Sequence, residues 1–234
     1  MKRLCLLVLP LVLLSMSIVL AYDVVDVKDG GVIKGKVKIT GNIPQDETVK
    51  VTKDKQHCGE TLPREKYVIA KDGGIKNVVI FIENITKGKP IPQEEVLIDN
   101  KHCAFQPHVQ VGTKGQTLVI KNNDPMLHNT HIYLEKRTVY NFALPKTGME
   151  IKKPIRQTGL MTVECDAHDW MKGYLYIVDH PYITVTDANG NFSIKDIPPG
   201  DYKLIIWHEA LGQQSRDVKV TPNGTVDLII EYKR

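Results

Sequence analysis

The chain of 234 residues is long enough for one or two domains with their own hydrophobic cores. Its hydrophobic fraction of 42% and its charged fraction of 25% are those of an ordinary globular protein. The formal net charge of +4 falls to +2 without Lys2 and Arg3, which lie in an apolar leader. A chain so close to neutral shows no charge signature of a nucleic acid or an anionic membrane as its partner.

Residues 1–21 have the pattern of a secretory signal peptide. Lys2 and Arg3 precede an apolar run that ends at Leu20, and Ala21 supplies a small residue at the cleavage position. We therefore expect a secreted, periplasmic protein with no membrane contact beyond this segment. The alternative is an uncleaved membrane anchor, although the run is near the lower length for spanning a bilayer.

The rest of the chain predicts an all-β fold. Strand-like runs, bounded by Gly, Pro and Asn, occur at 32–39, 49–51, 78–82, 109–111, 116–120, 130–134, 159–164 and 173–178. The run 78–82 is continuously apolar, which is typical of a strand buried on both faces. Residues 84–95 read as a polar loop, and the only helix-like stretch is one turn at 209–211.

The tail, residues 180–234, differs in composition from the preceding part and predicts a small sandwich of its own. Asn189-Gly190 between the runs 184–188 and 191–194 indicates a β-hairpin. A Pro-Pro-Gly turn at 198–200 leads into further strands at 202–207, 217–220 and 225–230. We expect these strands to complete a small antiparallel sheet.

The loop between the runs 159–164 and 173–178 carries Cys165, His168 and Met171, with two residues between each pair. A tight loop between two strands can direct all three side chains to one point. A thiolate, an imidazole and a thioether suit copper, whose trigonal sites add a second imidazole. His128 can supply it, because it follows a strand and a polar turn and can lie at the same end of a sandwich.

Three cysteines follow the leader, and an odd number leaves one thiol to explain in an oxidising compartment. Because Cys165 has neighbours typical of a metal site, a disulfide between Cys58 and Cys103 is the natural pairing. Other pairings stay open on the sequence alone.

Four segments together resemble the cupredoxins: 103–112 (CAFQPHVQVG), 120–124 (IKNND), His128-Asn129, and Cys165-x-x-His168-x-x-Met171-x-Gly173. The spacing of the last segment is similar to that of amicyanin, and the resemblance spans residues 98–179. It implies a cupredoxin Greek-key β-sandwich that binds one copper ion through His128, Cys165, His168 and Met171. It also implies that the backbone amide of Asn129 donates a hydrogen bond to the Cys165 sulfur and so tunes the redox potential.

The tail resembles the carboxypeptidase regulatory-like, transthyretin-type β-sandwich through residues 186–192 and 197–202. Residues 31–39 are similar to the first strand of that module. We therefore hypothesise that the cupredoxin-like part, 98–179, is inserted between an N-terminal β region at 22–97 and the rest of the module at 180–234. Residues 58–97 match neither module. The combined order is similar to periplasmic proteins of the methylamine-utilisation or plastocyanin-like type.

The predicted function is that of a type 1 (blue) copper protein that carries electrons between redox partner proteins, such as a cytochrome or a dehydrogenase. We expect no enzyme activity, because the motif offers neither an open coordination position nor a general base. One alternative is a copper-handling protein whose accessory sandwich docks a protein or a polysaccharide. Another is a subunit that feeds electrons to a catalytic centre on a different chain.

Other readings of these residues remain at this point. Cys165 with two histidines could hold zinc, although zinc does not bind a thioether, or the loop could bind no metal. His102, Cys103 and His108 could form a second metal site. His131 reads as a packed or surface histidine, because it lies on the opposite strand face from His128. Trp170 could dock a redox partner or shield the metal, and His208 beside Trp207 could line a pocket or be structural.

Overall fold

The computed structural model describes residues 22–234, so the predicted signal peptide lies outside the described residues. The described chain is almost entirely β, as the sequence predicts. The loop of residues 165–171, which carries Cys165, His168 and Met171, is here called the ligand loop. The strands before it are β1 (Asp23–Val24), β2 (Gly31–Thr40), β3 (Thr48–Lys50), β4 (Thr61–Pro63), β5 (Val79–Ile82), β6 (Lys87–Gly88), β7 (Val96–Lys101), β8 (Ala104–Gln106), β9 (Val109–Thr113), β10 (Thr117–Asn122), β11 (His128–Leu134), β12 (Arg137–Leu144), β13 (Met149–Pro154) and β14 (Gly159–Glu164).

The strands after that loop are β15 (Lys172–Val178), β16 (Ile183–Val185), β17 (Asn191–Ile197), β18 (Gly200–His208), β19 (Gly212–Val220) and β20 (Thr225–Lys233). Within residues 22–234 a single short helix occurs, α1 (Lys55–Cys58). The predicted helical turn at 209–211 is instead a hydrogen-bonded turn between β18 and β19. No helix of the described part is long and apolar enough to cross a membrane.

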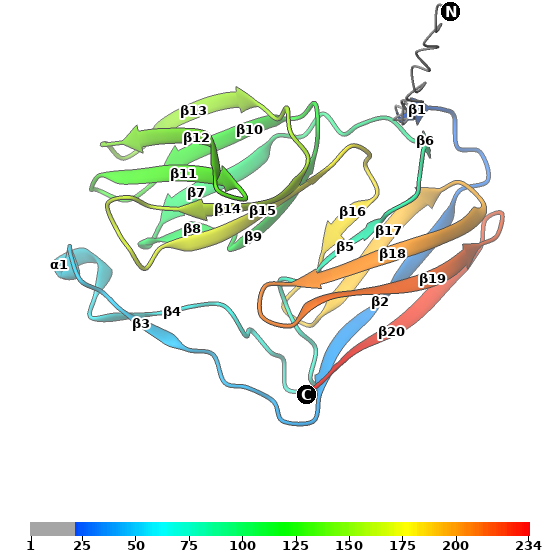
Figure 1. Cartoon of the computed structure of the whole chain (residues 1–234), viewed down its shortest axis with the longest axis horizontal. Coiled ribbons are helices and arrows are strands. Elements are labelled where there is room, and N and C mark those ends of the chain that lie inside the picture. Colours follow the sequence, from blue (N-terminus) through cyan, green and yellow to red (C-terminus); the bar gives the residue numbers. More distant parts are fainter. Residues whose placement is uncertain (1–21) are drawn as a thin grey trace, which may run out of the picture.

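The first of two sandwiches, here called the central sandwich, contains β7 to β15 (Figure 1). A four-stranded sheet in the order β13-β10-β7-β8 packs on a five-stranded sheet in the order β12-β11-β14-β15-β9. Apolar side chains that alternate along these strands fill the space between the sheets, among them Ile98, Leu118, Ile120, Ile132 and Leu175. Cys165 and Met171 belong to the same core.

The second, here called the terminal sandwich, is built from strands on both sides of the central one in the sequence. Its sheets have the orders β16-β5-β18-β19 and β17-β2-β20. Two of its strands, β2 and β5, therefore precede the central sandwich in the chain, and the other five follow it. The core between the sheets includes Ile33, Ile80, Tyr182, Leu204 and Ile206, each fully buried.

Two details of the predicted tail are wrong. Residues 184–194 do not form a hairpin, because β16 pairs with β5 while β17 pairs with β2 in the opposite sheet. The Asn189-Gly190 turn is present, with Gly190 at φ +80°, but the chain crosses there from one sheet to the other. Nor do the last strands form one antiparallel sheet, because β20 joins β2 in parallel.

The two sandwiches meet along a small apolar and aromatic interface. Trp207 of β18 lies edge-on to Tyr174 of β15, with ring centroids 5.3 Å apart, and Phe81 of β5 packs against Tyr176 at 5.1 Å. Trp207 is thus a packing residue between the sandwiches.

A long connection between β2 and β5, here called the arm (residues 41–68), leaves the terminal sandwich and reaches the central one (Figure 1). Its strands β3 and β4 pair with each other, and α1 lies at its tip. The arm is covalently attached there, because Cys58 forms a disulfide with Cys103. Val51, fully buried, packs with this disulfide and with Trp170. The arm therefore lies against the end of the central sandwich that carries the ligand loop.

The fold predicts an acid-sensitive stability through His208, which is fully buried between the sheets of the terminal sandwich. Its Nδ1 accepts a hydrogen bond from the Ala210 amide (3.2 Å), and its Nε2 has no partner among the described residues. Burial lowers the pKa of His208 to about 4, whereas in the unfolded chain it stays near 6.5. Between these values only the unfolded chain takes up the proton, so stability falls as the pH drops.

We expect this linkage to cost about 3 kcal/mol by pH 4. The variant His208→Phe removes the titrating group while keeping a ring beside Tyr67 and Tyr232. Urea unfolding of both proteins at pH 7 and pH 4.5 measures the effect. The variant should lose less stability on acidification than the wild type, and equal losses would contradict the assignment.

Candidate metal centre

The ligand loop is a pair of tight backbone turns between two antiparallel strands. β14 ends at Glu164 and β15 begins opposite it at Lys172. Within the loop, the His168 amide donates to the Cys165 carbonyl (3.3 Å) and the Met171 amide donates to the His168 carbonyl (3.1 Å). These successive turns place residues spaced by three on one side of the loop.

His128 reaches the same place from the neighbouring strand. It is the first residue of β11, which runs antiparallel to β14, with His131 opposite Glu164. The start of β11 and the end of β14 are therefore at the same edge of the sheet. The preceding turn is held by Asn122, whose side-chain amide donates to the carbonyls of Met126 (2.8 Å) and Leu144 (2.7 Å).

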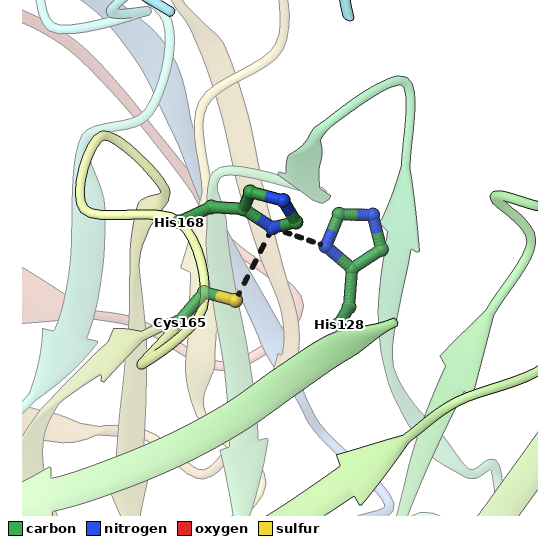
Figure 2. Close-up of side chains that lie close together, drawn as sticks. All are labelled: His128, Cys165 and His168. Atoms are coloured by element: carbon green, nitrogen blue, oxygen red, sulfur yellow. Dashed lines mark hydrogen bonds between the residues drawn. The ribbon is translucent and has the colours of Figure 1, made fainter. Parts of the chain in front are cut away.

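Three donor atoms converge at this edge, as Figure 2 shows. The Nδ1 atoms of His128 and His168 are 3.1 Å apart, and the Cys165 sulfur is 3.7 Å from the His168 Nδ1. All three residues are buried, and their donor atoms lie within 4.8 Å of one another. A first-row transition metal bound at roughly 2.0–2.3 Å to nitrogen and sulfur needs such donors about 3–4 Å apart. The geometry therefore fits a single metal ion.

A carboxylate contacts the Nε2 atom of each histidine and fixes its tautomer. The His128 Nε2 lies 2.9 Å from the Asp124 Oδ2, and the His168 Nε2 lies 2.8 Å from the Asp54 Oδ2. A carboxylate only accepts hydrogen bonds, so each Nε2 carries the proton and each Nδ1 keeps its lone pair. Both lone pairs are thereby available to one ion.

Asp124 also ties the ligand His128 to the disulfide region. Its carboxylate accepts hydrogen bonds from the backbone amides of His102 and Cys103, both at 2.8 Å. Burial alone would raise the pKa of Asp124, but these amides and His128 hold it below its ordinary value. Burial lowers the pKa of His128, against the opposing effect of Asp124. The pair is therefore an anionic carboxylate and a neutral imidazole near neutral pH.

The Cys165 sulfur accepts a hydrogen bond from the backbone amide of Asn129 at 3.3 Å, the contact that the cupredoxin resemblance implies. Asn129 also receives the Asp166 amide on its side-chain oxygen, at 3.2 Å. Burial raises the pKa of the Cys165 thiol, while the amide of Asn129 opposes that rise. A metal that binds here must displace the thiol proton.

Met171 is 3% exposed and packs in the core of the central sandwich with Cys165. It lines a small cavity with Phe105 and Trp170 at the boundary between the central sandwich and the arm. Its role as the axial ligand stays a prediction.

The candidates His102, Cys103 and His108 are not brought together as a metal-binding group in the described part of the chain. Cys103 is in the disulfide and has no thiolate to offer. His108 pairs through its Nε2 with Glu209 of the terminal sandwich. His131 lies outside the donor cluster, 3.0 Å from Asp166.

Trp170 packs beside the candidate centre and is half-buried. Its indole N–H donates to the Cys103 carbonyl at 3.1 Å, and its ring packs at 4.8 Å from that of His168.

Two residues of this site were missed from the sequence, Asp54 and Asp124. Asp124 stands four residues before His128 in a polar turn, a spacing that could have indicated it. Asp54 lies 114 residues before His168, and no local motif connects the two.

A family model described as polysaccharide lyase family 4, domain II, matches residues 156–228. The matched segment is less than half of the chain and includes strands of both sandwiches. The predicted carboxypeptidase regulatory-like module is not named by this match and stays a prediction. No curated protein matches the chain.

Among solved structures, the chain is similar to a Cu-containing nitrite reductase (NirK) from Thermus scotoductus SA-01, with 19% identity and a TM-score of 0.33. This likeness covers 39% of this chain and 24% of the reductase, so the chain matches about a quarter of that protein. A novel purple cupredoxin from Nitrosopumilus maritimus is 19% identical, with a TM-score of 0.31, over 36% of this chain and 98% of its own.

A reduced Cu(I) form of an amicyanin mutant is 17% identical, with a TM-score of 0.32, over 38% of this chain and 86% of its own. At these identities and TM-scores the solved structures do not define the candidate site, which is defined by the donor atoms of His128, Cys165 and His168.

The buried Asp124–His128 pair predicts a stability effect in the metal-free protein. Asp124→Asn replaces a carboxylate that accepts hydrogen bonds from two backbone amides and one imidazole. The new side chain carries an N–H₂ group, which cannot accept from those donors. We expect the free energy of unfolding to fall by about 2–4 kcal/mol, measured by urea denaturation.

Asp166→Asn is the matched control, because Asp166 forms the same kind of pair with His131 at the surface. That variant should change stability by less than about 0.5 kcal/mol. Equal effects of the two substitutions would show that Asp124 is not a structural centre of the site.

Proposed function

We propose that this chain is an exported, periplasmic protein that binds one copper ion and carries electrons between redox partner proteins. The observation that carries the proposal is the buried convergence of two imidazole nitrogens and one thiol sulfur, each from a fixed strand end or loop. His128, Cys165 and His168 would hold the metal, and Met171 would add a weak fourth ligand. Its partners would be a cytochrome or a dehydrogenase.

The donor set favours copper over zinc. Structural zinc sites are closed by four thiolate or imidazole donors, and this cluster supplies three such donors and a neighbouring thioether side chain. Two imidazoles and one thiolate with a weak axial methionine are typical of electron-transfer copper. When bound, copper supplies a Cu(I)/Cu(II) couple.

The surrounding residues suit electron transfer and not substrate turnover. The three donors are buried, at 0% exposure for His128, 1% for His168 and 5% for Cys165, so a substrate has no direct access to them. The carboxylates hold the rings in one orientation, and the Asn129 amide stabilises negative charge on the sulfur. A site that moves little between oxidation states transfers electrons readily. With Met171 as the fourth ligand, the site would leave no open position for a substrate.

A copper-handling role is the second candidate. It is favoured by the presence of a whole additional sandwich, part of which matches the polysaccharide lyase domain. In that case the terminal sandwich would dock a protein or a polysaccharide while the central one binds copper.

Reconstitution with Cu(II) tests the proposal. One equivalent should bind and give an intense visible thiolate-to-copper band. Cys165→Ser and His128→Ala should each abolish the band, because each removes one of the three converging donors. His131→Ala, which removes a nearby histidine outside the cluster, should leave it unchanged. Reversible one-electron voltammetry would support the carrier role, and an irreversible response would favour copper handling.

The axial assignment has a separate test. Met171→Leu fills nearly the same volume but removes the sulfur, so we expect copper to be retained and the reduction potential to rise. The measurement is voltammetry together with the copper content of the purified variant. Complete loss of copper, or an unchanged potential, would show that Met171 is not the axial ligand.

A further inference from the structure

We propose that the arm is part of the metal centre, with Asp54 as the residue that positions His168 and the Cys58–Cys103 disulfide as its anchor. This inference rests on the proposed copper site and assigns a role to a segment outside the central sandwich. Three sets of contacts carry it.

The first is a run of contacts between consecutive residues of the arm and of the ligand loop. The Thr52 hydroxyl donates to Asp169 at 3.1 Å, and the Lys53 ammonium donates to the Ala167 carbonyl at 3.3 Å. Asp54 accepts from the His168 Nε2 at 2.8 Å. The arm thus binds the loop at, before and after the ligand histidine.

The second is the direction of the Asp54 side chain. Asp54 is the N-cap residue of α1, a place where a carboxylate commonly bonds the helix amides. Here it makes no such bond, and only its backbone carbonyl receives the amides of His57 and Cys58. Its backbone is in the left-handed region, at φ 51°. The carboxylate is directed at His168 and not at its own helix.

The third is the enclosure of the His168 ring, which is 1% exposed. Trp170 and His128 each lie with their ring centroids 4.8 Å from it, and Asp54 covers its Nε2 edge. Asp54 itself is half-exposed, so it stands between the ring and the solvent.

The anchor explains how a half-exposed residue of a long connection keeps this position. Cys58 lies four residues after Asp54, and its disulfide partner Cys103 presents its amide to Asp124 and its carbonyl to Trp170. The disulfide therefore holds the arm to the same few residues that orient both ligand histidines. Without it, the arm would be held to the central sandwich only by the packing of Val51 and its neighbours and by surface hydrogen bonds.

Two substitutions separate the charge of Asp54 from its hydrogen bond. Asp54→Asn removes the charge and keeps an acceptor, and Asp54→Gly removes both; Asn and Gly both accept a left-handed backbone. Glu60→Gln is the matched control, because it removes a carboxylate from the same arm that pairs only with Lys55 at the surface.

The metal-free readout is the tautomer of His168, measured by nitrogen-15 NMR. It should be protonated at Nε2 in the wild type, in Asp54→Asn and in Glu60→Gln, and become a mixture in Asp54→Gly. A fixed tautomer in Asp54→Gly would overturn the positioning role. This measurement decides the role of Asp54 even if the wild type shows no thiolate-to-copper band, a result that would refute the copper site.

The copper-loaded readouts are affinity and potential. Asp54→Gly should lower the Cu(II) affinity about 10–100-fold, measured by competition with a chelator. Each tenfold decrease in the affinity for Cu(II) relative to the affinity for Cu(I) raises the reduction potential by about 59 mV. Asp54→Asn should fall between the wild type and Asp54→Gly. Equal shifts in Asp54→Gly and Glu60→Gln would show an unspecific charge effect and overturn the proposal.

The double variant Cys58→Ser/Cys103→Ser tests the anchor without leaving a free thiol. It should change the His168 tautomer and the Cu(II) affinity in the same direction as Asp54→Gly, although Asp54 is intact. Wild-type values in this variant would show that the disulfide does not hold the arm in place.

Discussion

The centre depends on one constraint, that two buried imidazoles must both offer Nδ1 to the same point. A neutral imidazole that presents Nδ1 carries its proton on Nε2, and a buried N–H without an acceptor is costly. Asp124 and Asp54 satisfy those two protons. The positions of both carboxylates therefore match what the proposed metal ion would require of the two rings, and the surrounding fold brings them there.

The two carboxylates come from different levels of structure. Asp124 is local to His128, in the turn between β10 and β11, so the central sandwich alone can hold it. Asp54 belongs to a connection of the terminal sandwich and is brought in by the disulfide. A loop of 45 residues closed in this way stabilises the fold by about 4 kcal/mol in the chain-entropy account. The covalent bond also keeps the tip of the arm at the central sandwich.

The sequence could predict those residues of the site whose spacing along the chain forms a local motif. Cys165, His168 and Met171 share one loop, and His128 follows a strand and a turn in the expected order. The prediction of a hairpin at 184–194 was wrong because an Asn-Gly pair indicates where the chain turns but does not determine which sheet the next strand joins. Asp54 could not be predicted, because its contact with His168 requires the arm to cross between two sandwiches and joins residues 114 positions apart in the sequence.

The terminal sandwich has a physical role even without a ligand of its own, because it holds the base of the arm. The Asp46 carboxylate accepts the amides of Glu65 (2.9 Å) and Tyr67 (3.0 Å), which joins the outgoing and returning chains. Beyond this point the chain re-enters the sandwich, where the Ile39 amide donates to the Gly73 carbonyl at 2.9 Å. With its base fixed by these bonds and its tip by the disulfide, the arm is held at both ends. Asp54 lies near the fixed tip, so the second sandwich helps to determine the geometry of a centre in the first.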